Sequence, residues 1–402
     1  MEHSDVIILG GGLVGLTLAI ALDAHGLSSV VIDPADPEAQ LAAGFDGRAS
    51  AIASASWRML ETIGVGALLS GQGCAIRRIE VRDGLSPESL GFDAGEDDDP
   101  LGIMFENRAV RAALRERAQK ATNVSLLAPA RPAQVIRDEG GVCVTLDDGR
   151  IFHAALLVGA EGRRSPTREA AGIRIAQWKY DHVAMIASIT HEKPHDNIAH
   201  EIFYPAGPFA LLPMLPGNRC CMVWSVRAED APAYLDLPDR AYLVEIDKRI
   251  GGMLGEIALV SPRSSYPLGF HHAATITAER LALVGDAAHG IHPIAGQGLN
   301  LGLRDVAALT EVLVEGARLG LDPGDAQLLA RYERWRSLDS LMVAVSTDGL
   351  TRLFGAPGRP ARAIRRLGLS AVERLSPLKR LFMTEARGEA GDLPKLLRGA
   401  TI

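Results

Sequence analysis

The N-terminal 33 residues restrict the fold more than any other part of the chain. Residues 5–9 (DVIIL) and 29–33 (SVVID) each contain an unbroken apolar run, which is typical of a buried strand. Between them, the glycine-rich segment 10–15 (GGGLVG) leads into an apolar run that ends near Gly26. A strand, a glycine turn, a helix and a second strand in this order predict a βαβ unit with parallel strands.

The glycines of this unit have the G-x-G-x-x-G spacing of a dinucleotide-binding turn. In such a turn Gly10 permits the tight bend, Gly12 lets the backbone approach a pyrophosphate, and Gly15 lets the helix pack close to the strand. The free N–H groups at the helix start, including those of Leu13 and Val14, would then face the phosphates. The alternative is a plain strand–turn–helix that uses glycine for its geometry alone.

An acid at the end of the second strand strengthens the dinucleotide interpretation. Asp33 follows Gly15 by 18 residues, close to the spacing of about 20 at which an acid binds a ribose hydroxyl. An acid there suits an adenosine ribose that lacks a 2′-phosphate. It therefore favours NAD or FAD over NADP as the bound dinucleotide.

A second glycine-rich segment near the other end of the chain suits the flavin half of FAD. Asp286 ends the apolar run LALVGD and would accept a hydrogen bond from a ribityl hydroxyl. The backbone N–H groups of the following helix start would face the flavin, where the positive end of the helix dipole stabilises negative charge. These N–H groups belong to Gly296, Gln297, Gly298, Leu299 and Asn300.

Two simpler interpretations compete at this segment. Asp286 alone would serve as a helix cap. Asp286, His289 and His292 together would suggest a metal site, but no fourth ligand or acid cluster accompanies them. We therefore predict no metal.

Three motifs together resemble the FAD-dependent aromatic hydroxylases, the single-component flavin monooxygenases. They are GGGLVG, LLVGAEGRRSPTR (residues 156–168) and GDAAHGIHPIAGQGLNLGLRD (residues 285–305). The sequence most resembles the ubiquinone-biosynthesis hydroxylases of the UbiH/VisC type, through FDGRASAIASASWRMLETIGV and the segment from Leu353 to Gly388. This resemblance implies FAD as cofactor, NAD(P)H as reductant, O₂ as co-substrate and hydroxylation of a polyprenylated phenol in ubiquinone biosynthesis.

The resemblance also implies roles for single residues. Arg48 and Pro293 match positions along the flavin in this family, and we predict them as the catalytic residues. Asn107 stands where relatives have Gln or Arg in contact with FAD, and Arg111 lies one turn later. Glu161 and Gly162 match the family's Asp-Gly motif, with Glu in place of Asp, which affects the expected contact with the pyridine nucleotide. Alternatively, Arg48 forms a surface salt bridge and Glu161 pairs with Arg168.

The predicted fold is α/β: a Rossmann-like FAD-binding domain, an interleaved β-sheet substrate domain and C-terminal helices. We expect mostly helix in residues 49–69 and strands from Tyr180 to Ser265, where the apolar stretch 203–217 either lines the substrate pocket or forms ordinary core. The predicted FAD-binding segments are 1–75, 106–179 and 271–330, the substrate-domain segments are 76–105 and 180–270, and the helical region is 331–402.

Composition and charge exclude several classes of protein. The net charge of −7 argues against nucleic acid as a partner. Residues 6–22 are apolar enough to suggest a signal or membrane segment, but their acidic flank and glycines argue against it. The cysteines lack metal spacing and suggest a cytoplasmic protein with reduced thiols.

The C-terminal region is basic in an otherwise acidic chain. Residues 352–402 contain 11 Lys and Arg against 4 Asp and Glu. An apolar stripe runs through Ile364, Leu367, Ala371, Leu375, Leu378 and Phe382 at helical spacing. This tail either packs on the flavin domain or binds the inner membrane surface or a quinone-biosynthesis complex. Two other functions stay open, namely a flavin enzyme with different chemistry (an epoxidase or prenyl reductase) and a non-catalytic FAD-binding accessory.

Overall fold

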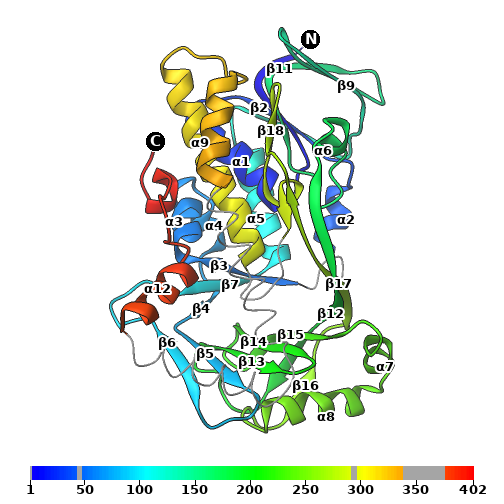
Figure 1. Ribbon diagram of the computed structural model, residues 1–402, viewed down its shortest axis with the longest axis vertical. Helices are drawn as coiled ribbons and strands as arrows, with labels where there is room; N and C mark the ends of the chain where they lie inside the picture. Colours follow the sequence, from blue (N-terminus) through cyan, green and yellow to red (C-terminus); the bar gives the residue numbers. More distant parts are fainter. Residues whose placement is uncertain (1, 43–47, 291–296, 338–375) are drawn as a thin grey trace.

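A sheet with a parallel centre and antiparallel edge strands, packed against helices, forms the upper body of the molecule (Figure 1). The computed structural model describes residues 2–42, 48–290, 297–337 and 376–402. In these residues, the sheet has eight strands, with β18-β19-β11-β1-β2-β8 in order and β10 and β9 continuing from β11. Its strands are β1 (Glu2–Leu9), β2 (Ser29–Ile32), β8 (Val124–Leu127), β9 (Pro132–Asp138), β10 (Gly141–Leu146), β11 (Ile151–Gly159), β18 (Thr277–Ala278) and β19 (Leu281–Leu283). The strands β19, β11, β1, β2 and β8 run parallel, as the predicted βαβ start requires.

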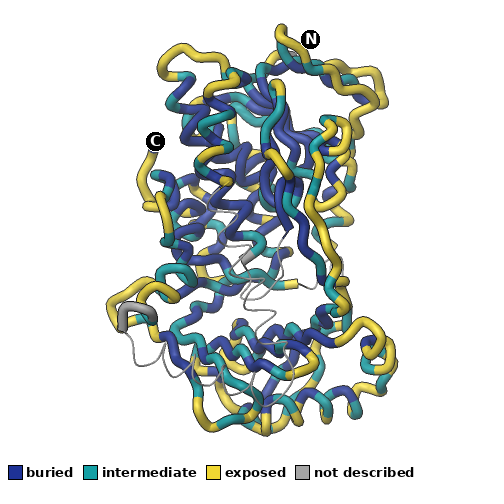
Figure 2. The backbone as a smooth tube through the Cα atoms, viewed as in Figure 1, coloured by how far each residue is buried: buried dark blue, intermediate teal, exposed yellow. Residues whose placement is uncertain are grey.

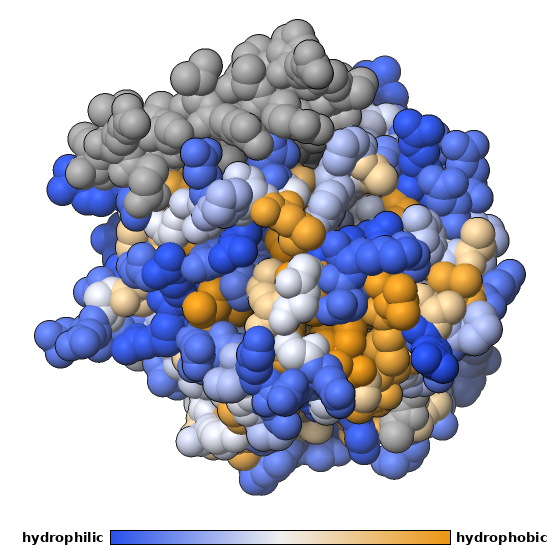
Figure 3. Space-filling model, turned by 90° about the horizontal axis from the view of Figure 1, so that it is seen from below, coloured by the Kyte–Doolittle hydropathy of each residue, from blue (hydrophilic) through white to orange (hydrophobic). Residues whose placement is uncertain are grey.

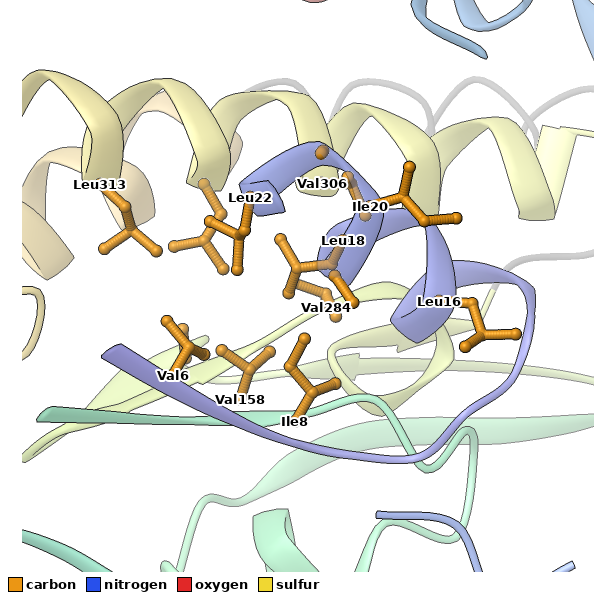
Figure 4. Packing of buried hydrophobic residues seen from close by; sticks show 14 of the residues in the cluster. Val6, Ile8, Leu16, Leu18, Ile20, Leu22, Val158, Val284, Val306 and Leu313 are labelled. Carbon is orange, nitrogen blue, oxygen red and sulfur yellow. The ribbon is translucent and has the colours of Figure 1, made fainter. Parts of the chain in front are cut away.

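Helix α1 (Leu13–Asp23) lies between this sheet and helix α9 (Gln297–Arg318). Leu18 and Leu22 of α1 are fully buried, and Figure 4 shows them packed between strand residues such as Ile8 and helix residues such as Val306. Helix α5 (Asn107–Gln119) packs against α1 as well. Residues 6–22 are thus a core strand and a core helix, and no helix in the described ranges is long and apolar enough to cross a membrane.

A second, mostly antiparallel sheet forms the lower body (Figure 1). Its order is β20-β17-β12-β15-β14-β13-β5-β6, with β16 beside β12. Its described strands are β5 (Arg78–Asp83), β6 (Ser89–Asp93), β12 (Ile175–His191), β13 (Ile198–Tyr204), β14 (Gly207–Met214), β15 (Arg219–Arg227), β16 (Ile257–Leu259), β17 (Ser264–Ala273) and β20 (His289–Gly290). The prediction of a second sheet here is correct, but it missed the helices within it, α7 (Ala231–Leu235) and α8 (Asp239–Ile250).

The two faces of the lower sheet have different neighbours. One face packs against α8, and side chains such as Phe209 and Leu211 are fully buried there. Leu212 and Met214 alternate with them and pack in the cluster on the other face. The apolar stretch 203–217 therefore provides core on one face and an apolar wall on the other. Seen from below, the outer surface is mostly polar with smaller apolar patches (Figure 3).

A small sheet lies between the two bodies (Figure 1). It consists of β3 (Ala49–Ala53), β7 (Gly102–Glu106) and β4 (Cys74–Ile76) in the order β3-β7-β4. The prediction of mostly helix in residues 49–69 is correct, although the first five residues form β3 instead. The helices are α3 (Ser54–Thr62) and α4 (Gly66–Leu69), joined by a short turn.

The other short elements lie at the edges of the two bodies. Helix α2 (Pro37–Leu41) interrupts the segment after β2, and α6 (Pro166–Ala170) follows β11. At the C-terminal end, α12 (Ser376–Ala386) and a 3₁₀ turn (Lys395–Arg398) lie beside α3 and β6, while residues 326–337 are helical. Figure 2 shows the burial: the sheet and helices of the upper body are its most buried part.

Candidate cofactor site

Three turns meet at the carboxyl ends of adjacent strands of the upper sheet. The turns follow β1, β11 and β19, and β11 lies between the other two strands. The carboxyl edge of a parallel sheet is where α/β proteins bind their ligands. The structure therefore brings together the three motifs that are far apart in the sequence.

In the turn after β1, two glycines have no room for a side chain, whereas a third faces open space. A β-carbon on Gly10 would lie 2.5 Å from the Ala160 carbonyl oxygen, and one on Gly15 would collide with the Gly10 carbonyl oxygen. Gly10 also has a φ of +105°, which favours glycine. By contrast, nothing lies within 4 Å of the β-carbon position of Gly12. Gly10 and Gly15 are thus required by the fold, and Gly12 leaves open space at the start of α1.

That open space adjoins free backbone donors. The first backbone hydrogen bond of α1 runs from the Leu16 N–H to the Gly12 carbonyl oxygen at 3.0 Å. The N–H groups of Leu13, Val14 and Gly15 precede it and have no partner inside the helix. Such a helix start binds phosphate through its N–H groups and its dipole. The turn therefore fits the pyrophosphate of FAD.

Asp33 borders the same turn from the end of β2. One carboxylate oxygen accepts the Gly11 N–H at 2.6 Å, and the other accepts the Ala35 N–H at 2.7 Å. A small hollow opens beside it and is also lined by Gln40 of α2 and Arg111 of α5. The structure thus places Asp33 and Arg111 together, as a ribose site would need.

Asn107 and Arg48 lie toward the middle sheet. Asn107 is buried at the start of α5, where its side-chain oxygen accepts the Ser50 hydroxyl at 2.6 Å and its N–H donates to the Arg48 carbonyl. The Arg48 guanidinium lies over the ring of Tyr266 at 5.2 Å. Arg48 therefore reaches from the FAD-binding body to β17 of the lower sheet. Its role toward a flavin stays a prediction.

Glu161 and Gly162 follow β11, next to Gly10. The Glu161 carboxylate accepts hydrogen bonds from the Ser165 hydroxyl at 2.8 Å and from Thr167, at the start of α6. Arg168 instead donates to the carbonyl oxygens of Ala287 and Arg163. The hypothesis of a Glu161–Arg168 pair is wrong, because each side chain is held by other groups.

Asp286 lies in a 3₁₀ turn (Gly285–Ala287) directly after β19. Its side chain is 46% exposed, and its recorded partner is Arg163, 3.4 Å away. Its backbone carbonyl accepts from His271 at 2.8 Å, and burial lowers the pKa of that histidine. The Asp286 carboxylate caps no helix in the described structure and is accessible, so it fits the ribityl-accepting role.

The start of α9 packs against the turns after β1 and β19. A β-carbon on Gly302 would lie 2.9 Å from the Val14 side chain and 3.1 Å from the Gly285 backbone. This close crossing places Gly298 and Leu299 near the turn after β1 and the turn after β19. Asn300 is buried, and its amide bonds the backbone of Ala51 and Ala53 at 2.8 Å each, so it joins α9 to β3. Gln297 opens the helix, whereas Gly296, Pro293 and His292 lie outside the described residues.

A buried charge cluster, not predicted from the sequence, supports this arrangement. Asp305 of α9 is completely buried and accepts His289 Nε2 and Arg336 Nε, each at 2.7 Å, and the Gly285 N–H at 2.8 Å. Burial alone would raise the Asp305 pKa, but the charges of His289 and Arg336 outweigh it and the pKa is lowered. His289 is thus a hydrogen-bonded core residue. No group of potential metal ligands occurs among the described residues.

The sequence did contain one signal for Asp305. It occupies the buried stripe of α9 between Leu301 and Leu309, at four-residue spacing where the helix otherwise has apolar residues. A charged residue in such a stripe needs a buried partner. Its partners, however, depend on contacts between distant segments.

Comparison with known proteins identifies the family of the chain. The model of the FAD binding domain family matches residues 3–342. Ubiquinone hydroxylase UbiL of Rhodospirillum rubrum is 50% identical over 402 residues, which cover 99% of this chain and 94% of the relative. The 3-demethoxyubiquinol 3-hydroxylase of Escherichia coli is 35% identical over 394 residues, with 96% and 99% covered.

A solved structure shows the same fold at low sequence identity. The p-nitrophenol 4-monooxygenase PnpA of Pseudomonas putida superimposes with a TM-score of 0.80 at 18% identity, over 98% of this chain and 100% of that one. The family match spans both glycine-rich turns and the Asp286 segment between β19 and α9. On these grounds, the chain belongs to the FAD binding domain family.

Proposed function

We propose that this chain is an FAD-dependent monooxygenase that hydroxylates the aromatic ring of a polyprenylated phenol in ubiquinone biosynthesis. NAD(P)H is the reductant and O₂ the co-substrate. The observation that supports this most is the meeting of the three motif turns at the carboxyl edge of one parallel sheet. The names of the related hydroxylases point to the same reaction class.

Different residues of the site would bind different parts of FAD. The turn Gly10–Gly15 would hold the pyrophosphate, Asp33 and Arg111 the adenosine ribose, and Asp286 the ribityl chain. The start of α9 would face the flavin ring with its N–H groups. FAD, once reduced by NAD(P)H, supplies the activation of O₂.

The substrate would lie between the flavin site and the lower sheet. The sheet face that carries Leu212 and Met214 is apolar and packs toward β3 and β7. An apolar wall suits a prenylated ring and excludes water from the reaction. Arg48 stands between the two bodies and would orient the ring or the flavin.

Product analysis tests the proposal. The purified, FAD-loaded protein should oxidise NAD(P)H with a prenylated phenol and release a product that contains one added oxygen atom. NAD(P)H oxidation without any hydroxylated product would favour a different flavin chemistry. A protein that binds FAD but oxidises no NAD(P)H would favour an accessory role.

We further propose that the enzyme works at the cytoplasmic surface of the inner membrane or in a quinone-biosynthesis complex there. A polyprenylated precursor is confined to the bilayer, and the C-terminal segment is basic while the whole chain is acidic. Leu381 and Phe382 of α12 are 61% and 37% exposed next to Lys379 and Arg380. Basic residues with exposed apolar neighbours suit an anionic lipid surface.

A further inference from the structure

One acidic residue lies in an apolar row of the lower sheet. Glu201 of β13 pairs with Val81 of β5 on one side and Ala210 of β14 on the other. The row continues from Ala210 to Val223 of β15 and then to Ile186 of β12. Residues paired across neighbouring strands point to the same face of a sheet. Ile186 in turn pairs with Ser264 of β17, so Glu201 is the charged member of an otherwise uncharged row.

One neighbouring row shows which face this is. Ala199 precedes Glu201 by two residues and therefore points the same way. It packs in the cluster that contains Met104 of β7, in the middle sheet. Ile202 points the opposite way, into the core beneath α8. The carboxyl group of Glu201 is thus on the face toward the FAD-binding body.

The other neighbouring row leads to the flavin side of the site. Ala184 lies two residues from Ile186 and pairs with Tyr266 of β17. The Arg48 guanidinium lies over the Tyr266 ring in a cation–π contact. Glu201 therefore shares its sheet face with the residue that contacts Arg48.

The Glu201 carboxyl group has no protein partner in the described structure. None of the described residues donates a hydrogen bond to it or forms an ion pair with it. Burial raises its pKa from 4.5 to about 7, yet the side chain is only partly buried. A partly accessible carboxyl group that lies in an apolar row and has no protein partner is available to bind a polar group of a ligand.

Other charged groups near this face are already engaged. Arg219 of β15 lies two residues before Cys221 on the same face and pairs with Glu106 at 2.7 Å. Asp83 of β5 lies two residues beyond Val81 and has interactions of its own. The charges of Glu80, Arg82 and His200 lie on the opposite face, where they contact each other.

We propose that Glu201 binds the phenolic hydroxyl of the aromatic substrate and accepts its proton. This inference rests on the proposed function and assigns the recognition of the substrate to a residue. The phenolic O–H bond breaks, the proton moves to a carboxylate oxygen of Glu201, and the electron pair stays on the substrate oxygen. The proton returns to the product oxygen or to water when the product leaves, so the step needs no oxidant.

The acidity of the two groups suits this transfer. A phenol has a pKa of about 10. A base with a pKa of about 7 takes its proton more readily than an ordinary glutamate does, and about half of it is ionised at pH 7. Deprotonation makes the ring more electron-rich and hence more easily hydroxylated.

Binding to the FAD-loaded enzyme tests the contact directly. The probes are a farnesylated phenol and its methyl ether, titrated by the change in flavin fluorescence. The wild type should bind the phenol about tenfold to a hundredfold more tightly than the ether, the range for a hydrogen bond to a charged group. Glu201→Gln should remove this preference, and the control Glu88→Gln, on an exposed turn of the same sheet, should keep it.

The pH profile separates a chemical role from a structural one. Wild-type kcat/KM should fall as the pH drops below about 7, where Glu201 becomes protonated. In Glu201→Gln, kcat/KM should be about a hundredfold lower at neutral pH and should not show this decrease below pH 7. Glu201→Asp should keep the decrease and recover part of the activity.

Several outcomes would overturn the inference. The first two are equal affinity of the wild type for the phenol and its ether, and no saturable binding of either compound. The other two are an unchanged pH profile in Glu201→Gln, and loss of FAD from both Glu201→Gln and Glu201→Asp. A wild type that forms no hydroxylated product, but prefers the phenol through Glu201, would refute the proposed function and leave this contact in place.

Discussion

The three glycines of the first turn have different physical roles. Gly10 and Gly15 are surrounded by backbone atoms, whereas Gly12 faces open space. A side chain at Gly15 would force α1 away from β1. A side chain at Gly12 would leave the fold in place and occupy the space expected for the pyrophosphate. Substitutions at Gly12 and Gly15 should therefore distinguish an effect on FAD binding from an effect on folding.

Gly12→Val should therefore give a folded protein that has lost FAD. Gly15→Val should lower the stability of the apoprotein itself, because its side chain collides with the Gly10 carbonyl. Flavin absorbance after purification and thermal unfolding of the apoproteins measure the two effects. A yellow, folded Gly12→Val protein would show that the phosphates lie elsewhere.

Asp286→Ala should weaken FAD binding without unfolding the chain. The Asp286–Arg163 pair is 3.4 Å apart and nearly half exposed, and such pairs contribute little to stability. Losing a charge-assisted hydrogen bond to FAD should raise its dissociation constant about tenfold to a hundredfold. Flavin titration of the apoprotein gives this constant, with Asp148→Ala on the surface as control. An unchanged constant would contradict the ribityl contact.

Among the elements, α9 connects the cofactor site to the rest of the molecule. Its first turn bonds β3 through Asn300, Gly302 packs on α1, and Asp305 holds the turn after β19. Three separate segments are thus positioned by one helix. Among these contacts of α9, the Asp305 cluster depends most on correct pairing, because it buries charged groups.

Asp305→Asn should destabilise the protein and weaken FAD binding. The substitution leaves Arg336 buried without a carboxylate, and breaking a buried pair costs about 3–5 kcal/mol. The same exchange in the surface pair Asp392–Arg398 should cost about 1 kcal/mol or less. Urea unfolding with and without FAD measures both variants. Equal losses at the two positions would contradict a supporting role for Asp305.

This stabilisation also has a pH dependence. The Asp305 pKa in the folded protein lies below the ordinary value of 3.8. Its contribution is therefore complete above that ordinary value and is lost as the pH falls through the lowered one.

The βαβ start and α9 were predictable because each has a strong local pattern. The same holds for the family and the α/β fold, which the comparisons confirm. By contrast, β3 has the small residues ASAIA and pairs with β7 across more than 50 residues of sequence, so its local pattern did not identify it. Glu201 was missed for a related reason, since only the strand register shows that its neighbours are apolar.

For the molecule as a whole, charge is distributed unevenly, and part of the basic tail is already paired. Arg387 lies 2.9 Å from Asp98, and Lys395 lies 2.7 Å from Glu315. These pairs join the end of the chain to both bodies. Most of the predicted apolar stripe, from Ile364 to Leu375, lies outside the described residues. The exposed residues Arg380, Leu381 and Phe382 of α12 are the described part that suits a membrane.

Lys379→Glu/Arg380→Glu should reduce binding to vesicles that contain anionic lipid. Each basic residue near such a surface contributes about 1 kcal/mol, and salt screens this attraction. Co-sedimentation at low and high salt measures the effect, with Arg240→Glu/Lys248→Glu on α8 as the matched control. Equal sedimentation of both double variants, or none of the wild type, would contradict membrane docking by α12.

The two bodies are joined in part by a ribbon of two long strands. β12 and β17 begin and end in different cores: Ala273 is buried in the upper one, and Met185 in the lower one. Their pairing shifts register between Lys179 and Val183, midway along the ribbon. A hydrogen-bonded ribbon resists stretching more than bending. We therefore expect the lower sheet to change its tilt relative to the upper sheet more readily than its distance from it.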